Sequence, residues 1–593
     1  MRDTNPLKPH RMRLADFTTD RRVIFLMGLA IPVGVGGVIS AWVLLHLIAL
    51  CTNLAYRGEW SMTTQGITLE NLGPYSVLVP VVGCFIIGLM ARYGSDKIRG
   101  HGIPEAMEAI LIGRSRIQPK VAILKPLSSA ISIGTGGPFG AEGPIIMTGG
   151  AIGSLLAQLV RLTDHERKSL LVAGAAAGMT AVFSTPVAAV LLAVELLLFE
   201  WKPRSFLPVV VAVLVSQALR GYVLDIGPLF ELGGHFELSP LTLFGAVALG
   251  LVAGLASGMC TYMVYATEDF FEKLPIHWMW WPALGGVVIG IGGLIEPAAL
   301  GVGYDNIRHL LAGNVAMSGV LLLLVVKAII WSVSLGSGTS GGVVAPLLIL
   351  GGALGTLMAP LLPASDPGFW ALVGMAALMG GTMRAPLTAS IFALELTGNF
   401  SAMVPVFAGC MAAYGVTVLL LKRSILTEKI ARRGLHILHE YRVDPFDLVR
   451  ASEVMTAPVE TFSSTDTVDR VVSHYSTIDE GHTSYPVVDE QNHVVAEVTR
   501  ADALEWAVQP GDEGRTLHDM LEGRDVVYGH PDELAGAIAD RMAVTGVGRI
   551  PIVDRDNGKL VGIIGRKDLF RVRVRRIAQE QQRSAFLRPS RSK

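Results

Sequence analysis

The chain carries little charge and little cysteine for its length. Asp, Glu, Lys and Arg together make up 17% of the 593 residues, and the formal net charge at pH 7 is −1. A near-neutral chain gives no electrostatic support for nucleic-acid binding. The four cysteines lie far apart, mostly within or beside apolar segments, and predict neither a disulfide framework nor a metal site. They are Cys51, Cys84, Cys260 and Cys410.

Signals for secretion and for catalysis are also missing. Residues 1–22 are polar and mixed in charge, unlike a cleavable leader, and form a predicted N-terminal segment. The sequence has no recognisable pairing of a nucleophile with a base and no metal-binding motif. An intramembrane enzyme is therefore not favoured.

Apolar residues are abundant instead, at 51% of the chain. From about Val23 to Leu421 they form stretches, several long enough to cross a bilayer and others broken by Gly and Pro. This predicts an all-α polytopic domain over residues 23–433, embedded in the lipid bilayer of the plasma (inner) membrane. Basic residues flank both ends, so the positive-inside rule places both termini in the cytosol after an even number of crossings. They are Arg11, Arg13, Arg21, Arg22, Lys422, Arg423, Lys429, Arg432 and Arg433.

The membrane region repeats itself. Pro144–Ala157 returns as Pro346–Ala359, and Pro186–Leu196 returns as Pro386–Leu396, at offsets of 202 and 200 residues. We therefore expect two halves, at about 23–220 and 240–421. Duplicated halves with broken helices at corresponding positions indicate a transport site at the repeat interface. The sequence leaves open whether the halves are parallel or inverted.

Gly-rich turns precede three predicted helices, at Gly100–Pro104, Gly134–Gly143 and Gly336–Pro346. Such turns can aim helix N-termini and bare amides at one point, which would suit an anion. Alternatively, each glycine only permits close helix packing. The presence of three such turns favours the ion site.

Glu142 is the candidate gate. An ionisable residue at bilayer depth is costly and usually functional, and a helix N-terminus attracts anions. Glu142 at such a terminus would compete with an anion, blocking the path when ionised and vacating it when protonated. The alternative is an acid that only stabilises its own helix dipole.

These residues together resemble the ClC family of chloride channels and proton-coupled chloride exchangers, over about residues 22–578. The resemblance implies an inverted-repeat fold, a homodimer with one pore in each subunit, and chloride or another small monovalent anion as the transported partner. The family's three anion-binding motifs correspond, in chain order, to Gly100–Pro104, Gly140–Pro144 and Gly342–Pro346. Its last membrane helix corresponds to Arg423–Lys429. The anion-pathway residues implied are His101, Gly102, Ile103, Gly143, Val343, Val344 and Leu426.

Several of these positions depart from the family pattern. His101 stands in place of a serine, Leu426 of a tyrosine, Val344 of a phenylalanine, and Ala141 of a basic residue. His101 could donate an N–H to an anion, or remain a neutral histidine bonded to backbone. The choice of anion is left open.

A further departure concerns protons. Glu195 matches a glutamate shared across the family, but Leu196 occupies the position of the proton-relaying acid in exchangers. Leucine carries no proton, which predicts a passive anion channel. The alternatives are an exchanger with an altered proton route, or a membrane nucleotide sensor without transport. Glu195 and its repeat partner Glu395 are predicted to tie helix breaks together by hydrogen bonds.

The remaining chain has the composition of soluble protein and repeats Tyr485–Val498 as Ile550–Ile564. It resembles a pair of CBS domains, an α+β module, at residues 446–508 and 516–577. The resemblance implies that Thr499, Asp502 and Asp568 contact an adenine nucleotide such as ATP, ADP or AMP, although no cofactor is required. Both aspartates could instead be helix caps. Residues 578–593 are predicted to be a basic disordered tail.

Overall fold

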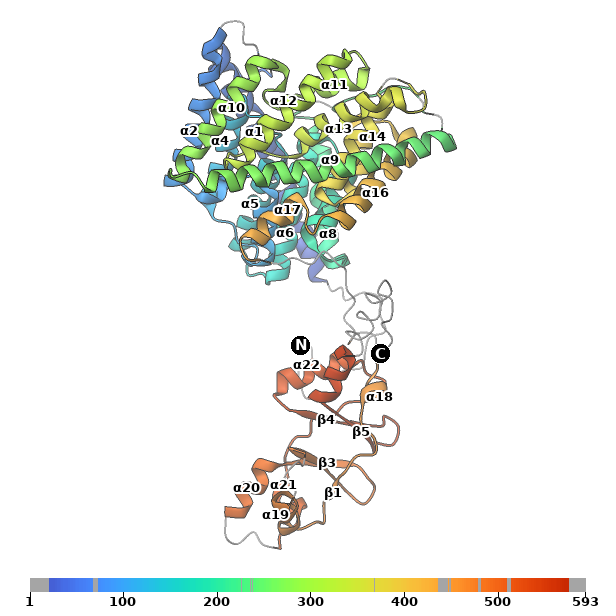
Figure 1. Ribbon diagram of the computed structural model, residues 1–593. Helices are drawn as coiled ribbons and strands as arrows, with labels where there is room; N and C mark the ends of the chain where they lie inside the picture. Colours follow the sequence, from blue (N-terminus) through green and yellow to red (C-terminus); the bar gives the residue numbers. More distant parts are fainter. Residues whose placement is uncertain are drawn as a thin grey trace. The chain divides into compact units, whose positions relative to one another are not determined.

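The computed structural model describes residues 21–64, 66–67, 73–224, 227–234, 236, 238–366, 368–435, 446, 449–477, 482–508 and 514–574. The predicted tail at 578–593 and nearly all of the N-terminal segment at 1–22 lie outside the described residues. The described residues up to 435 form one compact unit, and those from 446 onward form a second (Figure 1).

Helices build the first unit. The first half contains α1 (Arg22–Arg57), α2 (Leu78–Tyr93), α3 (Ile103–Leu111), α4 (Pro119–Gly134), α5 (Glu142–Leu159), α6 (Asp164–Phe183), α7 (Pro186–Leu192) and α8 (Pro203–Arg220). The second contains α9 (Pro240–Glu272), α10 (Trp281–Ile295), α11 (Tyr304–Ala312), α12 (Met317–Gly336), α13 (Val344–Met358), α14 (Phe369–Met383), α15 (Pro386–Thr397) and α16 (Met403–Leu420), followed by α17 (Ile425–Arg432). Short turns are η1 (Gly73–Val77), η2 (Asp96–Ile98), the π-helical η3 (Ala193–Leu198), η4 (Trp278–Trp280), η5 (Pro297–Ala299), η6 (Ala359–Leu361) and η7 (Phe400–Ala402).

The order of elements repeats from α1–α8 to α9–α16. Matched helices include α3 and α11, each of nine residues, and α5 and α13, which open at Glu142 and Val344. Proline lies in the first turn of α3, α7, α10 and α15, where its fixed φ and missing N–H do no harm. The structure therefore extends the sequence repeat over nearly the whole membrane unit.

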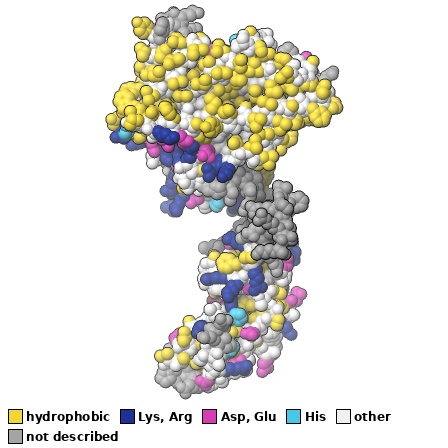
Figure 2. Space-filling model, viewed as in Figure 1, with side chains coloured by type: hydrophobic (Ala, Val, Ile, Leu, Met, Phe, Trp, Pro, Cys, Tyr) yellow, Lys and Arg dark blue, Asp and Glu magenta, His cyan; other side chains and the backbone are white. Residues whose placement is uncertain are grey.

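The outer surface of this unit is apolar, as expected for a surface in contact with lipid. Within the described residues, seven helical segments are long and apolar enough to cross a membrane. Hydrophobic side chains cover most of the visible face, and charged ones gather along one edge (Figure 2). The long α9 packs against α12, α14 and α16, yet Phe244 and Tyr262 on it are 73% and 70% exposed. An apolar surface of this extent would not be left in water.

Glu195 and Glu395 join the two halves reciprocally. Glu195 accepts hydrogen bonds from the backbone N–H groups of Leu387 (3.2 Å) and Thr388 (2.8 Å) at the start of α15. Glu395 accepts from the N–H groups of the corresponding residues of α7, at 3.0 and 2.8 Å. Each carboxylate thus satisfies free amides of the helix that matches its own in the other half. The expectation that these acids tie helix breaks together is confirmed.

The second unit is α+β. Strands β1 (Phe462–Ser463), β2 (Ser484–Val488) and β3 (Val494–Thr499) form one sheet, with β1 parallel and β3 antiparallel to β2. Strands β4 (Arg549–Val553) and β5 (Leu560–Gly565) form an antiparallel hairpin. The helices are α18 (Ala451–Val454), α19 (Val468–Thr477), α20 (Arg500–Val508), α21 (Leu517–Leu521) and α22 (Ala535–Thr545).

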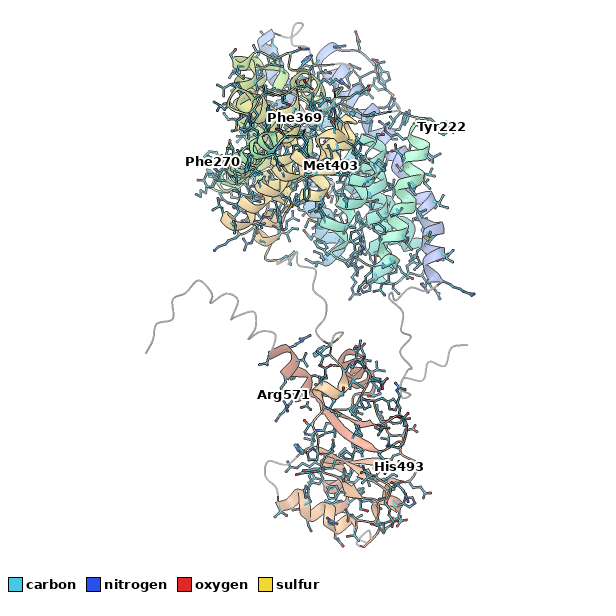
Figure 3. The ribbon with its side chains drawn as sticks, turned by 90° about the vertical axis from the view of Figure 1, so that its right-hand side faces the viewer. Tyr222, Phe270, Phe369, Met403, His493 and Arg571 are labelled. Atoms are coloured by element: carbon cyan, nitrogen blue, oxygen red, sulfur yellow. The ribbon has the colours of Figure 1, made fainter. Side chains whose placement is uncertain are left out.

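The turns of the two hairpins meet within this unit. His493, labelled in Figure 3, bridges to Lys559, and its Nε2 lies 3.0 Å from the carbonyl oxygen of Asn557. The N–H of Leu560 donates to the carbonyl of Asn492 at 2.9 Å. The repeated halves seen in the sequence therefore pack as a pair.

Candidate functional site

The three Gly-rich turns come together in the first unit. The N–H of Gly342 donates to the carbonyl of Gly140 at 2.9 Å, and the N–H of Gly140 donates back at 3.2 Å. Gly100 donates to the carbonyl of Thr339 at 3.0 Å. Helices α3, α5 and α13 consequently open around one point, as the sequence predicted. Their amide ends provide the positive partial charge that an anion would need.

Backbone contact at this point requires glycine. Gly102 has a φ of 89°, and a Cβ there would lie 2.5 Å from the carbonyl oxygen of Gly143. A Cβ on Gly143 would collide with the carbonyl oxygen of His101. The first and second turns can therefore touch only because neither residue has a side chain.

Glu142 lies where these turns meet. It is the first residue of α5 and is fully buried. Its carboxylate interacts with the amides of Glu142 itself and of Ala345, but among the described residues neither oxygen makes a hydrogen bond of normal geometry. Oε2 would lie 2.6 Å from a Cβ on Gly342. A buried carboxylate without a firm partner is costly, which indicates a functional group rather than a structural one.

The other predicted pathway residues also line helix starts. Ile103, Val343 and Leu426 are completely buried, and Val344 is 1% exposed. His101 is 2% exposed, and its Nδ1 has no hydrogen-bond partner within the described part of the chain. Its alternative role, a histidine bonded to nearby backbone, therefore gains no support from Nδ1.

The substituted relay position is buried as well. Leu196 is 2% exposed and lies in η3, which packs against α3. The neighbouring Glu195 is committed to the start of α15. Leu196 itself brings no titratable group to this place.

Two buried lysines were missed by the sequence analysis. Lys125 on α4 donates to the carbonyls of Ile98 (2.8 Å) and Gly100 (2.7 Å). Its repeat partner Lys327 on α12 donates to the carbonyls of Ala299 and Gly301, both at 2.9 Å. Each ammonium thus holds the turn before α3 or α11. A lysine inside an apolar stretch of each half was the signal available in the sequence.

The turn before α11 was also not predicted from the sequence. Gly301 and Gly303 have φ values of 62° and 77°, matching the left-handed Gly100 and Gly102 of the first half. Two glycines at the repeat offset were the only signal. A cavity of about 540 Å³ lies at this turn, lined by Ala141 and Tyr304 among others. The hydroxyl of Tyr304 is buried and has no partner in the described residues.

A second cavity, of about 350 Å³, opens beside the first and third turns, and we call it the basic mouth. Its lining residues are Asp96, Arg99, Glu268, Glu272, Trp278, Trp281, Leu335, Gly336, Gly338, Lys429, Arg432 and Arg433. Lys429 makes an ion pair with the buried Glu105 of α3 at 2.9 Å and lies against Gly100. This ion pair fastens α17 to the helix behind the first turn.

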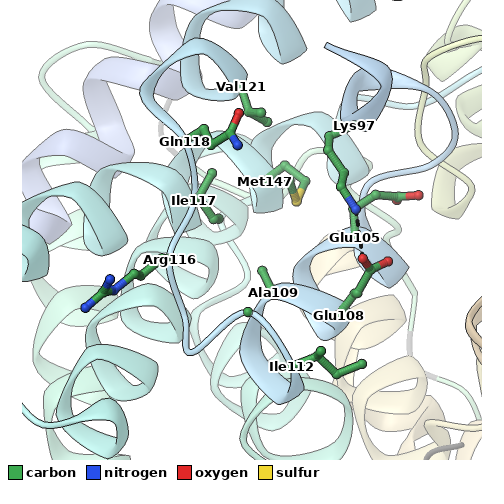
Figure 4. Close-up of a pocket in the computed structure, with 11 residues that line it drawn as sticks. Lys97, Glu105, Glu108, Ala109, Ile112, Arg116, Ile117, Gln118, Val121 and Met147 are labelled. Carbon is green, nitrogen blue, oxygen red and sulfur yellow. Dashed lines mark hydrogen bonds and ion pairs between the residues drawn. The ribbon is translucent and has the colours of Figure 1, made fainter. Parts of the chain in front are cut away.

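Figure 4 shows the smaller cavity on the other side of this ion-pair network. Lys97 donates to Glu108 at 2.8 Å, and Arg433 binds both Glu108 and Glu105. Glu105 also accepts a hydrogen bond from the N–H of Gly102 at 2.9 Å. The carboxylates of α3 are therefore fully engaged, and α3 is held rigidly at the site.

In the second unit, the side chains predicted to contact a nucleotide make hydrogen bonds and ion pairs within the protein. Asp502 accepts hydrogen bonds from the N–H (2.8 Å) and hydroxyl (2.6 Å) of Thr499, and an ion pair with Arg524 at 2.8 Å. Burial raises the pKa of this carboxyl, but the hydrogen bonds from Thr499 and Arg524 outweigh it and hold the pKa of Asp502 below its usual range.

In the second repeat of this unit, the corresponding aspartate is Asp568. Asp568 accepts a hydrogen bond from the N–H of Gly565 at 2.8 Å, and the hydroxyl of Thr456 donates to it at 3.1 Å. Thr456 therefore supplies the group that Gly565 lacks. Both aspartates act as caps in this structure, and nucleotide contact stays a prediction.

Comparison with known proteins decides the family. The sequence profile of the voltage gated chloride channel family matches residues 82–418, and that of the CBS domain matches 451–509 and 520–575. The chain belongs to the ClC family. An H(+)/Cl(-) exchange transporter, ClcA of Klebsiella pneumoniae (strain 342), is 31% identical over 353 residues, which cover 57% of this chain and 74% of ClcA.

Solved ClC structures show the same fold. A slow cyanobacterial Cl⁻/H⁺ antiporter matches 70% of this chain and 98% of its own, with a TM-score of 0.61 at 22% identity. A eukaryotic CLC transporter matches 92% of this chain and 97% of its own, with a TM-score of 0.56 at 20% identity. The predicted architecture, a ClC membrane domain followed by a CBS pair, is confirmed. It is an integral membrane protein of an anion-transporting family, whose relatives are transporters rather than enzymes.

Proposed function

We propose that this ClC protein exchanges chloride, or a similar small monovalent anion, for protons. The observation that carries the proposal is the buried Glu142 carboxylate, set without a firm partner among the starts of three helices. The ClcA relative, 31% identical, is an H(+)/Cl(-) exchange transporter. The sequence analysis favoured a passive channel because of Leu196, and this similarity supports its alternative better.

Exchange follows because the Glu142 carboxylate and the anion compete for the same position. When ionised, Glu142 occupies the amide-lined position that an anion would otherwise take. When protonated, the neutral carboxyl loses most of its attraction to those amides and gives way to the anion. One group therefore binds a proton or makes way for an anion, which links the two fluxes.

The choice of anion rests on few side chains. Backbone amides of Gly143, Val343 and Val344 and the ring N–H of His101 are the donors that we assign to the pathway. Leu426 and Val344 contribute apolar walls. Backbone donors favour small monovalent anions, and chloride is the proposed one because the ClcA relative is an H(+)/Cl(-) exchange transporter.

The setting is proposed on charge and family resemblance. Basic residues on α17 and just after it support a cytosolic position for this edge of the unit, and the proposed location is the plasma (inner) membrane. Both termini would then be cytosolic. The family resemblance supports a homodimer with one pathway in each subunit. Nucleotide at the CBS pair, through Thr499, Asp502 and Asp568, would modulate flux without being required for it.

Liposomes with the purified full-length protein test exchange directly. We expect an imposed anion gradient to drive protons uphill, with chloride compared against nitrate, bicarbonate and fluoride while internal pH is recorded. Empty liposomes with a proton ionophore provide the leak control. Anion movement without any proton movement would refute exchange.

A passive channel is the second candidate, and the observation that favours it is Leu196. A relay position filled by a buried leucine interrupts the series of titratable groups that exchange requires. The same liposome experiment separates the candidates, because a channel carries anions downhill and leaves the proton gradient unchanged.

Adenine nucleotide binding has its own test on the full-length protein in detergent. Titration calorimetry with ATP, ADP and AMP should show heat that Asp502→Asn reduces. Glu490→Gln, which changes an exposed acid in the same CBS half, serves as the control. Absence of heat with all three nucleotides would leave the aspartates as helix caps only.

A further inference from the structure

We infer that Glu268 of α9 carries protons between the cytosol and the site, so that anion and proton enter through the same basic mouth. The inference rests on the proposed exchange function. It answers the question that Leu196 raises, because exchange needs a protonatable group on this side of Glu142.

The basic mouth has the chemistry for anions. The Arg99 guanidinium lies 4.7 Å from the centre of the Trp278 ring and 5.8 Å from that of Trp281, which fixes it in place. Its Nε is buried and unpartnered within the described residues. Gly338 leaves room for it, because a Cβ there would lie 2.5 Å from Nη2. A held guanidinium with a free N–H can receive a small anion.

Glu268 is less firmly bound than Glu105 and Asp269, two acids close to the basic mouth. Glu105 is bound by Lys429 and by the Gly102 N–H, and Asp269 is bound by Arg432. The ion pair of Glu268 with Arg432 spans 3.9 Å, which is too long for a hydrogen bond. The Glu268 side chain is 28% exposed and lines the cavity. It can therefore take up or release a proton without breaking a hydrogen bond.

Charged groups from three segments face Glu268. Lys429 and Arg432 face it from α17, Arg99 from the segment after η2, and Glu272 from the next turn of α9. The cations favour its ionised form, and Glu272 opposes them. Asp96 also lines the cavity. An anion arriving at these cations would weaken their hold on the carboxylate and favour its protonation, so that anion entry would promote proton uptake at the same mouth.

A series of packing contacts connects the mouth with Glu142. Tyr265 is three residues before Glu268, on the same face of α9. It is 6% exposed, and its hydroxyl donates to the carbonyl of Ile425, the first residue of α17. One turn further along α17, Lys429 touches Gly100, the residue before His101. The carbonyl of His101 in turn abuts Gly143, next to Glu142.

The transfers balance without any other reactant. A proton from water in the mouth binds the Glu268 carboxylate, and the carboxyl releases it to water that enters the site with the anion. The Glu142 carboxylate accepts the proton from that water. Glu268 returns to its ionised state, and one proton has moved from the mouth to Glu142, which is left protonated.

The test uses the full-length protein in liposomes, with chloride efflux and internal pH recorded together. Glu268→Gln should lower the proton flux carried per anion by about a hundredfold, the lower end of the range for removing a proton-transferring group, while anion efflux continues. Glu272→Gln, an acid in the same mouth one turn away, is the matched control and should keep the wild-type ratio. An unchanged ratio in Glu268→Gln would overturn the inference.

Glu268→Asp guards against a merely structural effect, because it keeps a carboxylate at this position. It should retain most of the proton flux, and a ratio as low as that of Glu268→Gln would count against a proton-carrying carboxylate. Anion efflux by each variant reports that it is folded. If the wild-type protein itself moves no protons, proposed exchange fails; if it does and Glu268→Gln does so equally, only this inference fails.

Discussion

The reciprocal carboxylate bridges between the two halves allow a prediction of stability. In Glu395→Gln, one of the two oxygens that accept N–H groups from the start of α7 becomes an NH₂ group, which faces a donor instead. Losing one hydrogen bond to a charged acceptor costs about 1.5–3 kcal/mol. Removing a negative charge from a helix N-terminus costs about 0.3–1 kcal/mol more. We expect Glu395→Gln to destabilise the membrane unit by roughly 2–4 kcal/mol.

Heat denaturation of the detergent-purified protein, followed by tryptophan fluorescence, measures this effect. Glu296→Gln is the control, because Glu296 accepts a single long hydrogen bond of 3.3 Å from the N–H of Ala298 at an exposed helix end. Glu395→Gln should lower the midpoint clearly and Glu296→Gln hardly at all. Equal midpoints for the two variants would refute the claim that the carboxylate bridges hold the halves together.

Three further outcomes are expected. Gly143→Ala should abolish anion flux in liposomes, because its Cβ meets the carbonyl of His101; wild-type flux would contradict the backbone packing. Lys327→Met leaves two buried carbonyls without their donor and should lower the melting midpoint, with the conservative Lys327→Arg in between. The depressed pKa of Asp502 means that its bonds to neighbours such as Arg524 stabilise the fold above pH ~3.9 and fade as pH falls below it. In unfolding scans from pH 6 to 3, Asp502→Asn should therefore lose less stability than the wild type.

Local sequence signals were sufficient for much of the fold. Gly and Pro mark the starts of α3, α5 and α13 within a few residues, so the three turns could be placed and their convergence predicted. Glu142 stood out because an acid inside an apolar region at a helix start has few structural uses. The Tyr485–Val498 stretch recurs as Ile550–Ile564, and so a pair of CBS domains could be anticipated.

Contacts between distant segments could not be anticipated. The two carbonyls that Lys125 binds lie more than twenty residues before it, and the hydroxyl that it also binds, that of Ser340, lies in the other half of the membrane unit. The turn at Gly301 shares only two glycines with its partner, because backbone shape and not side-chain identity was retained there. Thr456 reaches Asp568 from 112 residues away, which no local pattern reveals.

Glu142→Gln in liposomes, with anion efflux and internal pH recorded together, tests the central claim most directly. The wild-type protein should move protons uphill when an anion gradient drives it, and its flux should depend on pH. Glu142→Gln, which resembles the protonated side chain, should carry anions faster at neutral pH, without coupled protons and with little pH dependence. A variant with the same flux, the same proton coupling and the same pH response as the wild type would contradict the assignment of Glu142.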